Sequence, residues 1–109
     1  MKELEYLVVE KATNLNREQI GKIYSGDTSE DYGVNIMLIL AIISFVIQVA
    51  PIIINWWKNR KMLARVNVYF IVRKQLRKEG NKDISAIKLS NAIYDVITSR
   101  PELVEEYNA

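Results

Sequence analysis

The longest apolar run in the chain covers residues 36–54 and contains only two polar side chains, Ser44 and Gln48. No formal charge occurs over residues 32–57, a stretch of 26 residues. The first eight apolar side chains of this run point all the way round a helix, whereas a buried soluble helix usually keeps a polar stripe. A helix over the last 22 of these residues is about 33 Å long, close to the roughly 30 Å hydrocarbon core of a bilayer. The pattern therefore predicts a transmembrane helix over residues 34–57.

Aromatic and basic side chains follow the apolar run directly. Tryptophans gather at the membrane–water interface, and Lys and Arg gather just beyond it on the cytoplasmic side. The residues that we predict at this interface are Trp56, Trp57, Lys58, Arg60 and Lys61.

The formal net charge of +2 conceals a strong polarity along the chain. Residues 1–33 hold four basic and seven acidic groups, whereas residues 58–109 hold eleven basic and six acidic groups. The positive-inside rule then places the N-terminal segment outside and the C-terminal segment in the cytoplasm. In a particle that contains a membrane, the basic side corresponds to the side that holds the genome.

The N-terminal segment has the spacing of two short amphipathic helices. The first covers Lys2–Ala12. Asn16 is a suitable N-cap for the second, with Gln19 at the reciprocal position of a capping box, and this helix stops near Gly26. Residues 25–33 are then an acidic loop. Because neither helix is long enough to be stable alone in water, each must lie on lipid, on another helix or on a partner protein.

The residues after the tryptophans also favour helix. Several cations followed by Gly80 and Asn81 are typical of a helix C-terminus, so we predict a basic helix that ends near Glu79 and continues unbroken from the membrane. Pro51 is expected to kink this helix, because it removes one backbone donor. Alternating apolar residues over 66–72 are also compatible with a strand.

Two further helices complete the pattern. Asp83 is the predicted N-cap of one helix, whose apolar face is periodic over residues 86–97. Ser99 and Glu102 have capping-box spacing with Pro101 in the first turn, which predicts a last short helix. The predicted fold is therefore all-α, with a single transmembrane helix and short amphipathic helices on both sides of it.

The composition removes most catalytic chemistry. The chain has no Cys and no His, and its four glycines form no phosphate-binding motif. The commonest general base, metal ligand and nucleophilic thiol are all missing. We therefore predict a protein that is not an enzyme and that uses no cofactor, no metal and no small-molecule substrate.

A cluster of cations on the predicted basic helix admits three interpretations. Cations near a span fix orientation and touch anionic lipid head groups. They also bind nucleic-acid phosphates, although no base-reading motif accompanies them here. Docking to an acidic protein surface is the third interpretation. The residues concerned are Arg73, Lys74, Arg77 and Lys78.

The leading hypothesis is a single-pass membrane protein that anchors or scaffolds a larger assembly of protein subunits, with a phage virion as one setting. An alternative is a membrane-permeabilising protein of the holin or ejection-channel type, for which Ser44 and Gln48 would have to begin a polar stripe. Gln48 could instead bond to its own helix backbone. A second alternative is a soluble helical interaction module.

Overall fold

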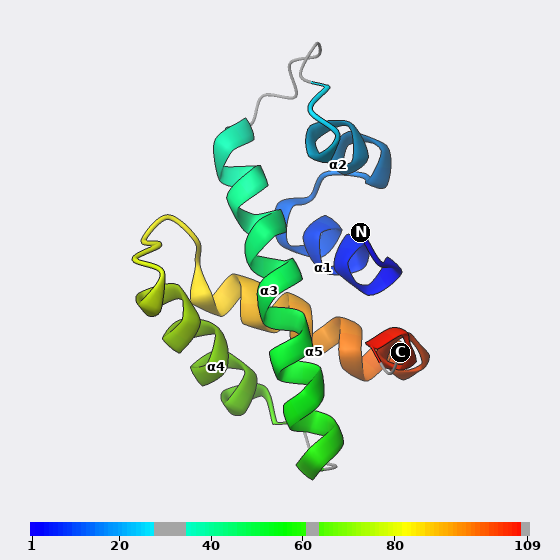
Figure 1. Ribbon diagram of the computed structural model, residues 1–109, viewed down its shortest axis with the longest axis vertical. Coiled ribbons are helices and arrows are strands. Elements are labelled where there is room, and N and C mark those ends of the chain that lie inside the picture. The colour runs from blue at the N-terminus through cyan, green and yellow to red at the C-terminus, as the bar shows by residue number, and fades with distance from the viewer. Residues whose placement is uncertain (28–34, 61–63, 108–109) are drawn as a thin grey trace.

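The computed structural model describes residues 1–27, 35–60 and 64–107, and within these ranges every regular element is helical (Figure 1). The prediction of an all-α fold is confirmed. In chain order the elements are α1 (Glu3–Thr13), α2 (Arg17–Tyr24), α3 (Ile36–Arg60), α4 (Arg65–Lys78), α5 (Ala86–Ser99) and a 3₁₀ helix, η1 (Pro101–Tyr107).

Helix α3 is the long central element, and α1, α2, α4 and η1 contact it directly (Figure 1). Helices α1 and α2 lie on one flank, α4 lies on the other, and α5 crosses the middle of α3. Side chains such as Val46, Val49 and Ile53 are fully buried on α3. They belong to one core that also takes in residues of α1, α2, α4, α5 and η1. The apolar run is therefore the centre of a bundle.

The N-terminal helices form as predicted. Asn16 accepts a hydrogen bond from the Gln19 backbone N–H at 2.8 Å, and the Gln19 side chain accepts one from the Asn16 N–H at 3.0 Å. The predicted capping box is thus confirmed. Arg17 then joins the two helices, because its guanidinium pairs with Glu3 at 2.6 Å and with Glu10 at 3.2 Å.

The prediction that one helix runs unbroken from the apolar run into the basic segment is wrong. Ala64 has extended backbone angles, φ −107° and ψ 145°, and α4 begins at the next residue. Helix α4 runs antiparallel to α3. Ile71, in the middle of α4, borders the same depression as Ile52, and Glu79, after the end of α4, borders the same depression as the earlier residue Gln48. The strand alternative for residues 66–72 is also wrong.

The reason for this reversal is burial. One face of α4, carrying Val68, Val72 and Leu76, packs mainly against α5. A straight continuation of α3 would leave these three side chains in water. Burying a side chain of this kind contributes roughly 1.5–3 kcal/mol. Pro51 lies within α3 and is exposed, and the kink that we expected there stays a prediction.

The helix ends in the C-terminal half agree only in part with the sequence analysis. Helix α4 ends where predicted, at Lys78 with Glu79 as its C-cap, and Gly80 follows in the left-handed conformation at φ 67°. The predicted N-cap Asp83 is wrong, since the Ser85 hydroxyl accepts from the Lys88 N–H at 3.2 Å and starts α5. Ser99 is not a cap either, because it lies in the last turn of α5 and donates to the Asp95 carbonyl at 2.6 Å.

The two ends of the chain are in direct contact. Helix α1 packs on α5 and on η1. The Tyr107 hydroxyl donates to Oε2 of Glu5 at 2.9 Å, and the Lys2 ammonium lies 4.0 Å from the centre of the Tyr107 ring. Glu5 is 5% exposed and also accepts from the Lys2 backbone N–H at 2.8 Å. The structure therefore joins segments that the sequence analysis placed on opposite sides of a membrane.

A cross-link tests this contact. Lys11 on α1 and Ser99 on α5 border the same small depression. Because the chain has no native cysteine, a Lys11→Cys, Ser99→Cys variant should form one intramolecular bridge with a short bis-maleimide. Peptide mass spectrometry of the reacted monomer would detect it. The single-cysteine variants are the controls, and two separately modified cysteines in the double variant would contradict the contact.

The bond between Tyr107 and Glu5 should stabilise the fold measurably. Tyr107→Phe leaves a buried carboxylate with one donor fewer, so we expect the free energy of unfolding in urea to fall by about 1–2 kcal/mol. Tyr69→Phe, at a ring whose hydroxyl has no hydrogen bond among the described residues, is the matched control. Burial, and then the bond to Glu5, raise the pKa of Tyr107. The difference between Tyr107→Phe and the unmodified chain should therefore persist at neutral pH and shrink above about pH 10, where the unfolded tyrosine ionises.

Candidate interaction surface

The outer face of α4 combines large apolar side chains with cations. Val66 and Phe70 are 54% and 56% exposed, and Lys74 and Arg77 continue the same line towards the end of the helix. These four residues are spaced by four, four and three positions, so they form one straight stripe on the helix surface. We call this set, Val66, Phe70, Lys74 and Arg77, the α4 outer stripe.

The cations predicted to contact phosphate or anionic lipid lie at this stripe or beside it. Lys74, Arg77 and Lys78 are exposed and Arg73 is half-buried. Within the described ranges none of the four makes an ion pair or side-chain hydrogen bond. Arg65, at the start of α4, differs because it pairs with Asp95 at 2.9 Å. The four later cations therefore serve no visible structural purpose.

The exposed face of α3 carries a second feature. Ser44, Gln48, Asn55 and Asn59 are all exposed and lie along one side of the helix. We call them the α3 polar stripe. The sequence analysis recognised the first two and missed Asn55 and Asn59, which lie beyond the apolar run. The spacing of seven from Gln48 to Asn55 would have indicated that they share its face.

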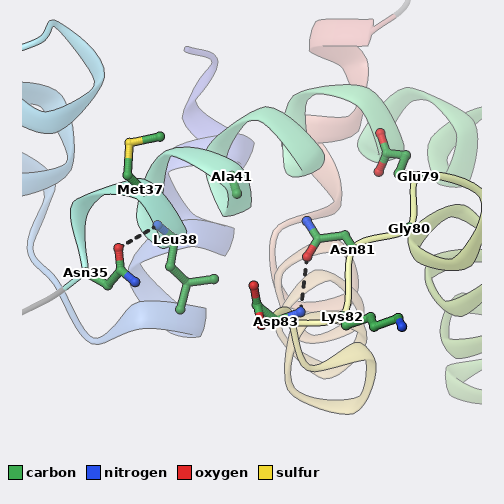
Figure 2. A pocket seen from close by; sticks show the side chains of 9 residues that line it. All are labelled: Asn35, Met37, Leu38, Ala41, Glu79, Gly80, Asn81, Lys82 and Asp83. Atoms are coloured by element: carbon green, nitrogen blue, oxygen red, sulfur yellow. Dashed lines mark hydrogen bonds between the residues drawn. The ribbon is translucent and has the colours of Figure 1, made fainter.

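Shallow depressions border the α3 polar stripe on the side of α4. One of about 470 Å³ contains Ile52, Asn55, Trp56, Asn59, Arg60 and Ile71. Another of about 230 Å³ contains Ala41, Ser44, Phe45, Gln48, Glu79 and Asn81. A third of about 630 Å³ separates the first turns of α3 from the turn between α4 and α5 (Figure 2). Together they outline a groove along one flank of α3.

The third depression offers no catalytic arrangement. The side-chain oxygens of its two asparagines accept hydrogen bonds from nearby backbone groups. Asn35 Oδ1 accepts from the Leu38 N–H at 3.2 Å, and Asn81 Oδ1 accepts from the Asp83 N–H at 3.3 Å (Figure 2). Among the described residues, no three His, Cys, Asp or Glu side chains gather as a metal site would need.

The predicted membrane-interface residues lie at the far end of α3. Trp57 packs against the core, whereas Trp56 is half-buried beneath the Arg60 guanidinium, 5.1 Å from its ring centre. Lys58 is half-buried nearby, and Lys61 lies outside the described residues. Trp56 and Arg60 also border the depression that contains Ile71 of α4. These two residues therefore adjoin α4.

Charged groups lie along the first half of α3. Glu79 borders the depression of Ser44 and Gln48, while Lys82 and Asp83 border that of Leu38. A charged side chain at the centre of a bilayer costs about 2.5–3.5 kcal/mol on insertion scales. In this packed arrangement, the turn between α4 and α5 places charged groups beside the apolar first half of α3.

Comparison with protein-family models, with curated proteins and with solved structures finds no match to this chain. Within the part of the chain that the structure describes, α3 is the one helix long and apolar enough to cross a membrane. That finding rests on length and composition alone.

Substitutions on α4 should show which of its cations stabilise the fold and which do not. Arg65→Gln loses the ion pair to Asp95 and the stacking on Tyr94, whose ring centre is 4.3 Å away. We expect the free energy of unfolding in urea to fall by about 1 kcal/mol. Lys74→Gln with Arg77→Gln should leave it within about 0.5 kcal/mol. Equal losses in the two variants would show that the later cations also hold the fold.

Proposed function

We propose that this chain is a non-enzymatic helical subunit of a larger assembly, attached to an anionic membrane surface through the α4 outer stripe. The observation that carries the proposal is the stripe itself. Two large apolar side chains more than half exposed and two unpaired cations lie on one line of one helix. This is the arrangement of helices that lie in the plane of a membrane interface, with apolar side chains in the lipid and cations at the head groups.

The apolar half of the stripe favours lipid over nucleic acid. Phosphates of either partner would attract Lys74 and Arg77. A nucleic-acid backbone would leave Val66 without an apolar partner, whereas a bilayer offers hydrocarbon directly beneath its charged layer. Each cation near such a surface contributes about 1 kcal/mol. Trp56 and Arg60, which adjoin α4 from α3, are suited to extend the contact.

A spanning α3 is the second candidate, and one observation favours it. The helix has 25 residues, and only 39% of its most apolar window of 18 residues is buried. Much of its apolar surface is therefore left for lipid. This form requires α1 and α5 to separate, since α3 would then stand between them. The N-terminal segment would lie outside and the C-terminal segment in the cytoplasm, as the charge asymmetry predicts.

Vesicle binding tests the surface attachment. The chain should sediment with vesicles containing phosphatidylserine, much less with pure phosphatidylcholine, and less again as salt rises. Lys74→Gln with Arg77→Gln should weaken partitioning by about 2 kcal/mol, roughly 30-fold. Phe70→Ser should also weaken partitioning, because it removes an apolar side chain that would enter the lipid. Lys11→Gln with Lys88→Gln removes the same charge from exposed positions on α1 and α5 and should change binding little.

Extraction separates the two candidates. A chain held at the surface is released from membranes by alkaline carbonate, whereas a chain whose α3 spans the bilayer stays in the pellet. Equal loss of binding in the α4 variant and in the Lys11, Lys88 control would show that net charge alone drives attachment. That result would remove the α4 outer stripe from the function.

A further inference from the structure

The α3 polar stripe has an internal symmetry. Ser44 and Asn59 lie at equal distances from the point midway between Pro51 and Ile52, and so do Gln48 and Asn55. All of these side chains are exposed on α3. When two identical helices are laid antiparallel about that midpoint, Ser44 of each faces Asn59 of the other. Gln48 then faces Asn55, and the apolar Ile52 lies near the symmetry axis.

We propose that the α3 polar stripe binds a second copy of this chain, antiparallel, about a two-fold axis that passes between Pro51 and Ile52. A two-fold contact uses the same patch on both partners, so the patch must complement itself. Amide side chains do this, since each both donates and accepts hydrogen bonds. The symmetric spacing of the four polar residues about the point between Pro51 and Ile52 matches an antiparallel copy of the same helix, whereas a partner of different sequence does not require it.

The charges beside the stripe give independent support. Glu79 borders the groove next to Ser44 and Gln48, and Arg60 borders it next to Asn55 and Asn59. Neither makes an ion pair among the described residues. Both lie on the flank of α3 that faces α4. A two-fold axis across the face of α3 keeps this flank on the same side in both copies, so Glu79 of one copy meets Arg60 of the other.

The size of the contact explains why these charges take part. A stable interface needs about 800 Å² from each partner. The stripe from Ser44 to Asn59 is about 22 Å long, which is too short for one helix face to supply that area alone. The walls of the groove must contribute the rest. The proposed contact uses α3 and the groove beside it, so it stands independently of lipid binding through α4.

Single cysteines in the whole chain test the arrangement, because no native cysteine competes. Ile52→Cys lies next to the proposed axis and should form a disulfide-linked dimer under mild oxidation. Met37→Cys, at a position 74% exposed on the same face, is the control. In an antiparallel pair the two copies of residue 37 lie about 43 Å apart along the helix and should not cross-link. Efficient dimers from both variants would indicate a parallel pair, and none from either would indicate no pairing, so either result overturns the proposal.

Mixed variants test the register and the charges. Ser44→Cys mixed with Asn59→Cys should give mostly the cross-linked heterodimer. In sedimentation, Glu79→Arg and Arg60→Glu should each weaken dimerisation by roughly five- to ten-fold, and the double variant should recover it. Unmodified lipid binding by the Ser44→Cys and Asn59→Cys variants keeps this test separate from the function of α4. The charge variants are compared in dimerisation alone, because Arg60 and Glu79 lie close to the proposed lipid contact. Heterodimers no more abundant than homodimers, or a double variant weaker than either single one, would overturn the proposed pairing.

Discussion

The need to cover one uncharged helix controls the rest of this structure. Helix α3 carries a nearly continuous apolar surface, and water around that surface is costly in proportion to its area. Helices α1, α2 and α4 and the 3₁₀ helix η1 contact it directly, and α5 completes the core that buries side chains such as Ile43, Val46 and Ile53. The other helices are too short to be stable alone, so they depend on α3 as much as it depends on them. The N-terminal and C-terminal segments are thereby brought into one core.

The polar groups follow from the same constraint. The one buried carboxylate of the described core, Glu5, is satisfied by Tyr107 and by the Lys2 backbone, and it joins the two ends of the chain. Arg17 and Arg65 pair with acids of neighbouring helices and hold α2 to α1 and α4 to α5. Among the described residues, the four later cations of α4 have no such partner. The contrast between paired and unpaired cations on α4 distinguishes its structural end from its candidate binding end.

The two candidate surfaces use different chemistry. The α4 outer stripe offers apolar surface and positive charge, which is suited to an anionic lipid layer. The α3 polar stripe offers three neutral amides and one hydroxyl in a symmetric order, which is suited to a copy of itself. The groove beside α3, on the side of α4, lies next to the α3 polar stripe.

Local signals in the sequence determined the helical elements and several of their ends. The capping box at Asn16 and the left-handed cap at Gly80 depend only on neighbouring residues, so they could be predicted. The unpaired cations of α4 and two members of the α3 polar stripe could also be named from the pattern. The reversal before Ala64 could not, because the gain that drives it is the burial of Val68 and Val72 on α5, and local patterns do not reveal which surface the next helix will cover. For the same reason, only the tertiary structure decided that α1 meets α5, since an uncharged stretch of this length can satisfy its apolar surface equally well with lipid or with its own chain.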